Sequence, residues 1–313
     1  MAEIGTDIEK AVKLLMNDEL VAIPTETVYG LAGNALNRSS VTKIFSVKDR
    51  PQFDPLIVHV PDLEKAREYV LEIPEAAKKL AEKFWPGPLT LLLKKKSIIP
   101  DLVTAGLDTV GIRCPDHSLT RELLKRLPFP LAAPSANPFG YVSPTRPEHV
   151  DEQLGNKIQY ILNGGVCPVG IESTIVGFED DQPVVYRLGG LSVEAIESVV
   201  GKVNLMTHST SNPKTPGQLK SHYAPGKKVI LGSIEELLKT RTRAGVLSFS
   251  KDYRVKNQII LSPAGKTEEA AQHLFESLRV FDKLDVDVVL TELVPDQGLG
   301  RAINDRLRRA AAV

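Results

Sequence analysis

Residues 207–226 constrain the fold of this chain more than any other feature of its sequence. The stretch holds three prolines together with several serines and threonines, and its apolar residues follow no helix or strand period. Proline fixes the backbone angle φ and lacks an N–H group, so this composition predicts an extended linker. A linker here separates residues 1–206 from residues 227–313, and we expect each part to form its own domain.

Short apolar runs alternate with amphipathic stretches before the linker, which is the pattern of an α/β domain. A capping box at Thr6–Glu9 predicts a helix with Leu15 and Met16 on its apolar face. Further helices are predicted at 39–48, 62–71, 74–84 and 191–200, strands at 20–23, 56–60, 89–93, 109–113, 130–133, 159–162, 173–178 and 184–188, and a turn at 85–88. The strands are unevenly spaced, so we expect a mixed, twisted sheet rather than a purely parallel one.

The part after the linker alternates strands and helices regularly, and it predicts a smaller three-layer domain of Rossmann-like character. Its strands are predicted at 228–231, 244–249, 258–261 and 286–290, and its helices at 233–241, 267–283 and 299–311. A dinucleotide fingerprint is absent, because Ile303 stands where the third glycine of that motif would fall.

Composition excludes several classes of protein. Lys and Arg number 39 and Asp and Glu also number 39, so the chain lacks the basic excess of a non-specific nucleic-acid binder. Cys114 and Cys167 stand in no CxxC motif or Cys/His cluster, which favours two buried thiols over a zinc site or a redox dithiol. No apolar run approaches the roughly 18 residues that span a bilayer, and the N-terminus lacks a signal-peptide pattern. We therefore expect a cytoplasmic protein without a membrane partner.

Polar side chains gather at predicted strand ends and beside prolines, where open α/β sheets place their ligand contacts. Thr25 and Thr27 follow the first buried strand, and Arg113 ends a later one. Lys48 and Arg50 stand two residues apart just before a proline, and this arrangement predicts a phosphate clamp. The usual signatures of P-loop proteins, zinc proteases, serine hydrolases and kinases are absent, so the site is built differently.

Further residues extend this candidate site. Arg187 ends another predicted strand, and a buried arginine is costly unless it faces a carboxylate or a phosphate. Ser135 and Ser143 supply short donors beside the small residues of 130–133, on which a flat ligand can lie. Four cations concentrated in a neutral protein, two of them in the clamp, suit a triphosphate bound together with a carboxylate.

Each of these residues also has a structural interpretation. Thr25 and Thr27 are suited to capping a turn, and Lys48 and Arg50 are suited to complementing the dipole of the helix that they end. His59 lies within a predicted strand, where a histidine is more often part of the core than a ligand contact.

Six segments occur together, in order, that resemble the YrdC-like domain. They are 24–31, 48–50, 55–60, 85–90, 132–137 and 170–176. The linker that ends in His222-Tyr223-Ala224-Pro225, followed by a small α/β domain, is similar to the two-domain form of the L-threonylcarbamoyladenylate synthase family. The run Gly300–Arg306 is also similar, so the resemblance covers nearly the whole chain.

The resemblance implies a nucleotidyltransferase that makes threonylcarbamoyl-AMP and pyrophosphate from L-threonine, bicarbonate and Mg²⁺-ATP, the first step of a tRNA modification. Residues implied to contact threonine are Thr27, His59, Arg113, Ala133 and Ser173. Residues implied to contact ATP are Lys48, Arg50, Asp54, Thr109, Ser135, Ser143, Arg187 and Tyr223. The family often has Asn where this chain has Asp54, so a contact through Mg²⁺ is the alternative there; we expect no metal held by protein side chains.

The implied chemistry needs no covalent enzyme intermediate, so catalysis rests on positioning and charge by Lys48, Arg50 and Arg113. A free carbamate loses carbon dioxide readily, and the linker with Tyr223 is a candidate lid that excludes water. The resemblance also implies that the product passes to a complex that transfers the threonylcarbamoyl group to tRNA. Binding of tRNA by this chain itself is expected to be weak or indirect.

Three other functions compete with this hypothesis. One is an RNA-binding module, against which the neutral charge and the 5% of aromatic residues argue. Another is a regulatory module that binds a nucleotide without turnover. The third is the carbamoyl transferase of hydrogenase maturation, whose cysteine-rich zinc motifs do not occur here.

Overall fold

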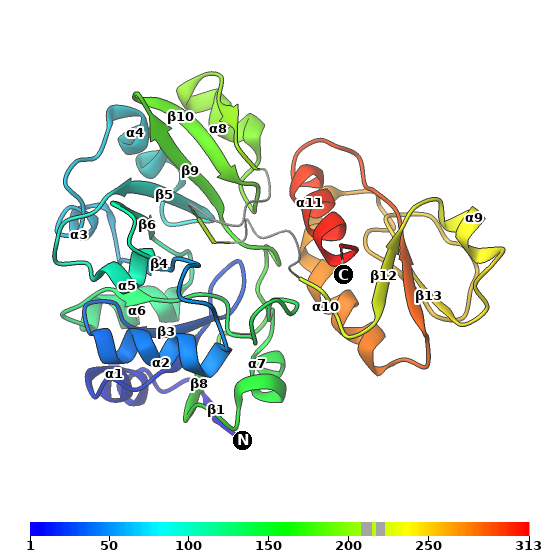
Figure 1. Cartoon of the computed structure of the whole chain (residues 1–313), viewed down its shortest axis with the longest axis horizontal. Coiled ribbons are helices and arrows are strands. Elements are labelled where there is room, and N and C mark those ends of the chain that lie inside the picture. The colour runs from blue at the N-terminus through cyan, green and yellow to red at the C-terminus, as the bar shows by residue number, and fades with distance from the viewer. Residues whose placement is uncertain (208–214, 217–222, 313) are drawn as a thin grey trace.

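The computed structural model describes residues 1–207, 215–216 and 223–312, and it shows a larger and a smaller α/β unit side by side (Figure 1). Strands of the larger unit form one sheet in the order β1-β8-β2-β3-β7-β4-β6-β5-β9-β10-β11. Their bounds are β1 Glu3–Gly5, β2 Val21–Ile23, β3 Gly30–Asn34, β4 Ile57–His59, β5 Leu89–Lys94, β6 Thr109–Arg113, β7 Leu131–Ala132, β8 Tyr160–Leu162, β9 Thr174–Glu179, β10 Gln182–Arg187 and β11 Asn204–Leu205.

The predicted mixed sheet is confirmed, because β4 pairs with β6 in parallel whereas β5 pairs with β6 antiparallel. The helices of this unit are α1 Ile8–Met16, α2 Arg38–Lys48, α3 Leu63–Ala66, α4 Glu75–Phe84, α5 Asp101–Thr104, α6 Ser118–Arg126, α7 Pro147–Leu154 and α8 Val193–Val200. The predicted turn at 85–88 contains a cis peptide bond between Trp85 and Pro86. The Trp85 indole N–H donates across this turn to the carbonyl oxygen of Leu89 at 2.8 Å.

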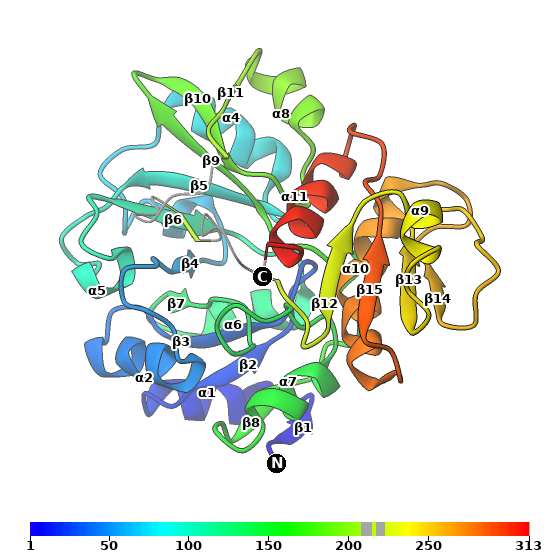
Figure 2. The same cartoon turned by 45° about the vertical axis from the view of Figure 1, so that its right-hand side comes forward.

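The smaller unit holds a parallel sheet in the order β12-β15-β13-β14. Its elements are β12 Lys228–Leu231, α9 Ile234–Leu238, β13 Ala244–Ser248, β14 Gln258–Ile260, α10 Thr267–Lys283, β15 Val288–Thr291 and α11 Gly300–Ala310. Figures 1 and 2 show α10 and α11 between this sheet and the larger unit, with α9 on the opposite face. The predicted three-layer arrangement is therefore confirmed.

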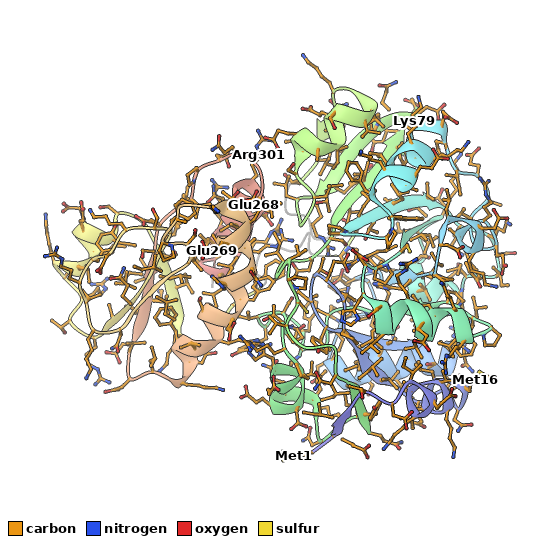
Figure 3. All side chains as sticks on the ribbon, turned by 180° about the vertical axis from the view of Figure 1, so that it is seen from behind. Met1, Met16, Lys79, Glu268, Glu269 and Arg301 are labelled. Carbon is orange, nitrogen blue, oxygen red and sulfur yellow. The ribbon has the colours of Figure 1, made fainter. Side chains whose placement is uncertain are left out.

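Several local predictions need correction. The first helix is capped by Asp7 rather than Thr6, because the Asp7 carboxylate accepts from the backbone N–H of Lys10. Met16 is 51% exposed and does not belong to the apolar face (Figure 3). The predicted helix at 62–71 shrinks to α3, because Val70 at its predicted end forms an antiparallel bridge with Lys95 instead. Elements that the sequence did not predict are β1, β3, α5, α6, α7 and β11.

The two units share a buried junction. One hydrophobic core includes Val142 and Ile171 of the larger unit together with Leu274 and Leu278 of α10. The chain at Gly170 approaches α10 so closely that a Cβ atom there would lie 2.4 Å from the Cα of Gln272. Because backbone meets backbone at this point, the units pack directly against each other.

The predicted extended linker and its lid fall largely on residues 208–214 and 217–222, which lie outside the described residues. At its far end the backbone N–H of Ala224 donates to the carbonyl oxygen of Gly140 at 3.1 Å. The boundaries 1–206, 207–226 and 227–313 stay a prediction. Among the helices that the structure describes, none combines the length and apolar character needed to cross a membrane.

Candidate active site

A pocket opens at the carboxyl end of three strands that run in the same direction, β4, β6 and β10. Each strand ends in a predicted site residue, namely His59, Arg113 and Arg187. His59 and Arg113 are neighbours in the parallel register of β4 and β6. The predicted residues that line the pocket are Arg50, His59, Arg113, Ala133, Ser135, Arg187 and Tyr223.

Arg113 lies against a carboxylate that the sequence analysis did not single out. Its Nη2 is 2.8 Å from Oε2 of Glu26 and also donates to the Thr27 hydroxyl at 2.8 Å. Both charged side chains are buried, and a buried arginine needs such a partner. The signal that could have found Glu26 is its place between two threonines of the motif 24–31, directly after a buried strand.

His59 is a neutral group in this site. Burial, helped by the positive charge of Arg113, lowers the pKa of the imidazole to about 3. At neutral pH it therefore adds no charge, and its ring nitrogens serve only as a hydrogen-bond donor and an acceptor.

The predicted phosphate clamp divides into two different environments. Arg50 lines the pocket, and its Nη2 lies 2.9 Å from Oδ2 of Asp54. Lys48 is buried away from the pocket lining, and its ammonium group donates to the carbonyl oxygens of Ser135 and Asn137. Burial lowers the pKa of Lys48 well below its usual value. Lys48 thus braces the turn that carries Ser135, while Asp54 serves as the counterion of Arg50.

A second buried carboxylate, Glu172, lines the opposite part of the pocket. The Ser143 hydroxyl donates to its Oε1 at 2.6 Å. Nearby, Arg187 donates through Nε and Nη2 to the carbonyl oxygen of Ser173, at 3.0 and 2.9 Å, and through Nη2 to its hydroxyl at 3.0 Å. Burial lowers the pKa of Arg187 to about 10, so this guanidinium keeps its charge at neutral pH.

Tyr223 reaches the pocket from the segment that directly precedes the smaller unit. It is almost completely buried, and its ring stacks on Phe275 of α10 with centroids 5.5 Å apart. Burial raises the pKa of its phenol to about 12, so the hydroxyl stays protonated at neutral pH. Because α10 belongs to the smaller unit, both units contribute to the surroundings of the pocket.

Thr109 is a predicted site residue that does not line this pocket. It begins β6 whereas Arg113 ends it, and four residues of extended chain span about 13 Å. Thr109 lines a neighbouring cavity with Leu92 and Thr215 instead. Within the described parts of the chain, no group of three or more His, Cys, Asp or Glu side chains is placed to hold a metal ion.

Buried arginines and short hydroxyl side chains around one pocket at strand ends define an α/β protein that binds small anionic ligands. Two family models match the chain. The first, described as telomere recombination and named for Sua5, YciO and YrdC, matches residues 13–189. The second, described as the C-terminal domain of threonylcarbamoyl-AMP synthase, matches residues 191–312. The chain therefore belongs to the Sua5/YciO/YrdC family, in its form with the additional C-terminal domain.

Full-length relatives agree with this assignment. The chain is 40% identical to a threonylcarbamoyl-AMP synthase of Pyrococcus abyssi, covering 97% of this chain and 94% of the relative. It is 41% identical to that of Bacillus subtilis, covering 97% and 92%. The crystal structure of P. abyssi Sua5 complexed with L-threonine matches with a TM-score of 0.93 and 39% identity, covering 99% of this chain and 97% of that one.

Proposed function

We propose that this protein is a threonylcarbamoyl-AMP synthase, which converts L-threonine, bicarbonate and ATP into threonylcarbamoyl-AMP and pyrophosphate. The observation that carries the proposal is the pocket, which gathers three buried arginines at one sheet edge in a chain that matches such synthases over both of its units. The match to a threonine complex over 99% of this chain supports the amino-acid end of the site.

The arginines divide the two substrates between them. Arg113, beside the Thr27 hydroxyl and the neutral His59, is suited to the carboxylate of threonine. Arg50 and Arg187 line the same pocket and are suited to the phosphates of ATP. Ala133 leaves room for the methyl group of threonine, because its own side chain is a single carbon.

The reaction then follows from positioning. The amine of threonine forms a bond to the carbon of bicarbonate with loss of water, which gives a carbamate. A carbamate oxygen bonds to the α-phosphorus of ATP, the bond from that phosphorus to the bridging oxygen breaks, and pyrophosphate leaves. Arg50 and Arg187 stabilise the charge that develops on the phosphates, and Arg113 holds the carboxylate.

Mg²⁺ enters this site as part of the nucleotide. Each carboxylate nearest the pocket has an arginine as its counterion, since Glu26 pairs with Arg113, Asp54 with Arg50, and Glu172 with Arg306. The chemistry of the site therefore fits a metal carried by ATP phosphates, where it would neutralise charge, better than one bound by the chain.

We further propose that the reaction takes place in the cytoplasm and that its product passes to a tRNA-modifying complex. Binding of tRNA by this chain itself is then weak or indirect.

Pyrophosphate release tests the proposal. With Mg²⁺-ATP, we expect pyrophosphate only when L-threonine and bicarbonate are both present. Serine lacks one methyl group, which is worth about 1–3 kcal/mol, so it should be a poor but detectable substrate. Equal release without threonine would show a pyrophosphohydrolase instead.

The competing RNA-binding module makes the opposite prediction. Tight tRNA binding that falls steeply with salt, with no threonine-dependent turnover, would favour that module, because phosphate contacts release counterions. A nucleotide-binding module without turnover would bind ATP and release no pyrophosphate under any condition.

A further inference from the structure

The last helix of the chain, α11, places an arginine against the pocket. Arg306 is completely buried, and its Nε and Nη2 lie 3.1 and 2.9 Å from Oε2 of Glu172. Its guanidinium also lies over the ring of Tyr223, 5.0 Å from the centroid. Both Glu172 and Tyr223 line the pocket, so Arg306 of the smaller unit contacts two residues of the pocket lining.

Glu172 in turn binds Ser143, whose hydroxyl donates to the other carboxylate oxygen, Oε1, at 2.6 Å. A hydroxyl has one proton, and Ser143 donates it to Glu172. Ser143 does not itself line the pocket, so this hydrogen bond helps to fix the orientation of the Glu172 carboxylate, which does. This orientation depends on an ionised Glu172, because a protonated carboxyl can donate the hydrogen bond itself.

The groups that face Glu172 come from four parts of the fold. They are Arg306 of α11, Arg187 of β10, the Ser143 hydroxyl and the Tyr223 phenol, with Asp305 beside Arg306 at 3.0 Å. Burial alone would raise the pKa of Glu172, but Arg306, Arg187 and Ser143 together lower it. Among these groups Arg306 makes the direct charged contact, at 2.9 Å.

We propose that Arg306 is a positioning residue for ATP, which fixes Glu172 and Tyr223 and thereby makes the smaller unit part of the nucleotide end of the pocket. The proposal rests on the proposed function for the identity of the nucleotide. The task of the C-terminal unit is then to position pocket residues. An exposed ion pair at the junction could not do this, because it does not reach Glu172 or Tyr223, whereas buried Arg306 contacts both.

Three variants distinguish a role of Arg306 in positioning pocket residues from a role in packing alone. They are Arg306→Met, Arg306→Lys and Arg301→Met. Arg301 is a matched control because it lies on the same helix and also crosses the junction, pairing with Glu194 at 3.1 Å with its side chain 31% exposed (Figure 3). We expect Arg306→Met to raise the KM for ATP at least tenfold and to change the KM for threonine less than twofold. Arg301→Met should leave both constants unchanged.

The pH dependence gives a second readout. In Arg306→Met, Glu172 loses its principal counterion, so its pKa rises and the carboxylate protonates as the pH falls. The KM for ATP should then climb towards acidic pH in this variant, at pH values where the wild-type constant is flat. Arg306→Lys keeps a positive charge beside Glu172, so its profile should stay flat even though its KM for ATP remains raised.

Two further measurements keep the proposal falsifiable. If Arg306→Met fails to fold, Glu172→Gln removes the other partner of this ion pair in nearly the same volume and should raise the KM for ATP without an acidic limb. Calorimetric ATP affinity without threonine tests Arg306 even if the wild-type protein makes no threonylcarbamoyl-AMP, so the two proposals fail separately. Unchanged ATP affinity in folded Arg306→Met or Glu172→Gln, or equal losses for ATP and threonine, would overturn the role of Arg306.

Discussion

Two of the buried ion pairs at the pocket, Arg113–Glu26 and Arg306–Glu172, are built in different ways. Glu26 and Arg113 both belong to the larger unit, where a loop after β2 meets the end of β6. Glu172 and Arg306 come from different units and lie 134 residues apart in the chain. The electrostatic solution is the same, because each buried charge finds an opposite partner. The difference is that the Glu26–Arg113 pair forms within the larger unit, whereas the Glu172–Arg306 pair forms only when the two units pack against each other.

The largest effect is expected at the pair within one unit. Arg113→Ala should lower kcat/KM for threonine more than tenfold, because loss of a buried charge-assisted partner costs about 2–5 kcal/mol. Steady-state kinetics with threonine varied at saturating ATP measures this. Arg113→Lys should not restore kcat/KM for threonine, because an ammonium group cannot form the bidentate hydrogen bonds of a guanidinium with a carboxylate. A threonine constant like that of the wild type would remove Arg113 from the amino-acid end.

A comparable but ATP-directed effect is expected from the other pocket arginines. Arg50→Ala and Arg187→Ala should each raise the KM for ATP about tenfold or more, which corresponds to at least about 1.4 kcal/mol. Arg38→Ala is the control, because Arg38 is exposed at the start of α2. If both variants weakened threonine more than ATP, the division of the pocket into two ends would be wrong.

An intermediate effect is expected at Tyr223, which lies where the two units meet. Its ring lines the pocket together with Arg50 and Arg187, the two arginines suited to phosphates. Tyr223→Ala should cost about 1–3 kcal/mol in ATP binding, the worth of one stacked or hydrogen-bonded aromatic. The control is Tyr253→Ala. Tyr253 does not line the pocket, and the ammonium group of Lys251 lies 4.9 Å from the centroid of its ring, so this variant should leave ATP binding unchanged. Equal affinities in the two variants would count against Tyr223.

The smallest effect is expected from an ion pair that crosses the junction at the surface. Lys283 lies 2.6 Å from Glu152, but the two side chains are 66% and 46% exposed. Lys283→Ala should change the free energy of unfolding by about 0–1 kcal/mol and leave the kinetic constants alone. Denaturant unfolding of this variant beside Arg306→Met shows whether burial, rather than crossing between units, decides the effect. A larger loss in Lys283→Ala would reverse that conclusion.

The sequence predicted elements with a strong period more reliably than irregular ones. Helix α10 has the predicted bounds 267–283, because its apolar residues repeat along one face over many turns. Strand β3 was missed because two of its five residues are glycines, which have low β propensity, and its pairing with both β2 and β7 supports it. The predicted helix at 62–71 is shorter in the structure because Val70 forms an isolated bridge with Lys95, a long-range contact that overrode local propensity.

The site shows the same limit. Its cations were predictable, since arginines at strand ends stand out in a sequence. Their partners were not, because Glu26 and Glu172 are ordinary carboxylates until the fold brings them to Arg113 and Arg306. No local pattern encodes a contact between residues as distant in the chain as Glu172 and Arg306, which are 134 positions apart, and Arg306 therefore acquires a role only in the folded chain.

The proposed reaction joins threonine, a carbon from bicarbonate and AMP in one pocket. Mass spectrometry of the product formed from ¹³C-bicarbonate, L-threonine and Mg²⁺-ATP tests it most directly. We expect a compound that contains AMP and threonine and whose mass rises by one unit when labelled bicarbonate replaces unlabelled. A product that contains AMP and threonine but no carbon from bicarbonate, or the absence of any adenylate of threonine, would contradict it.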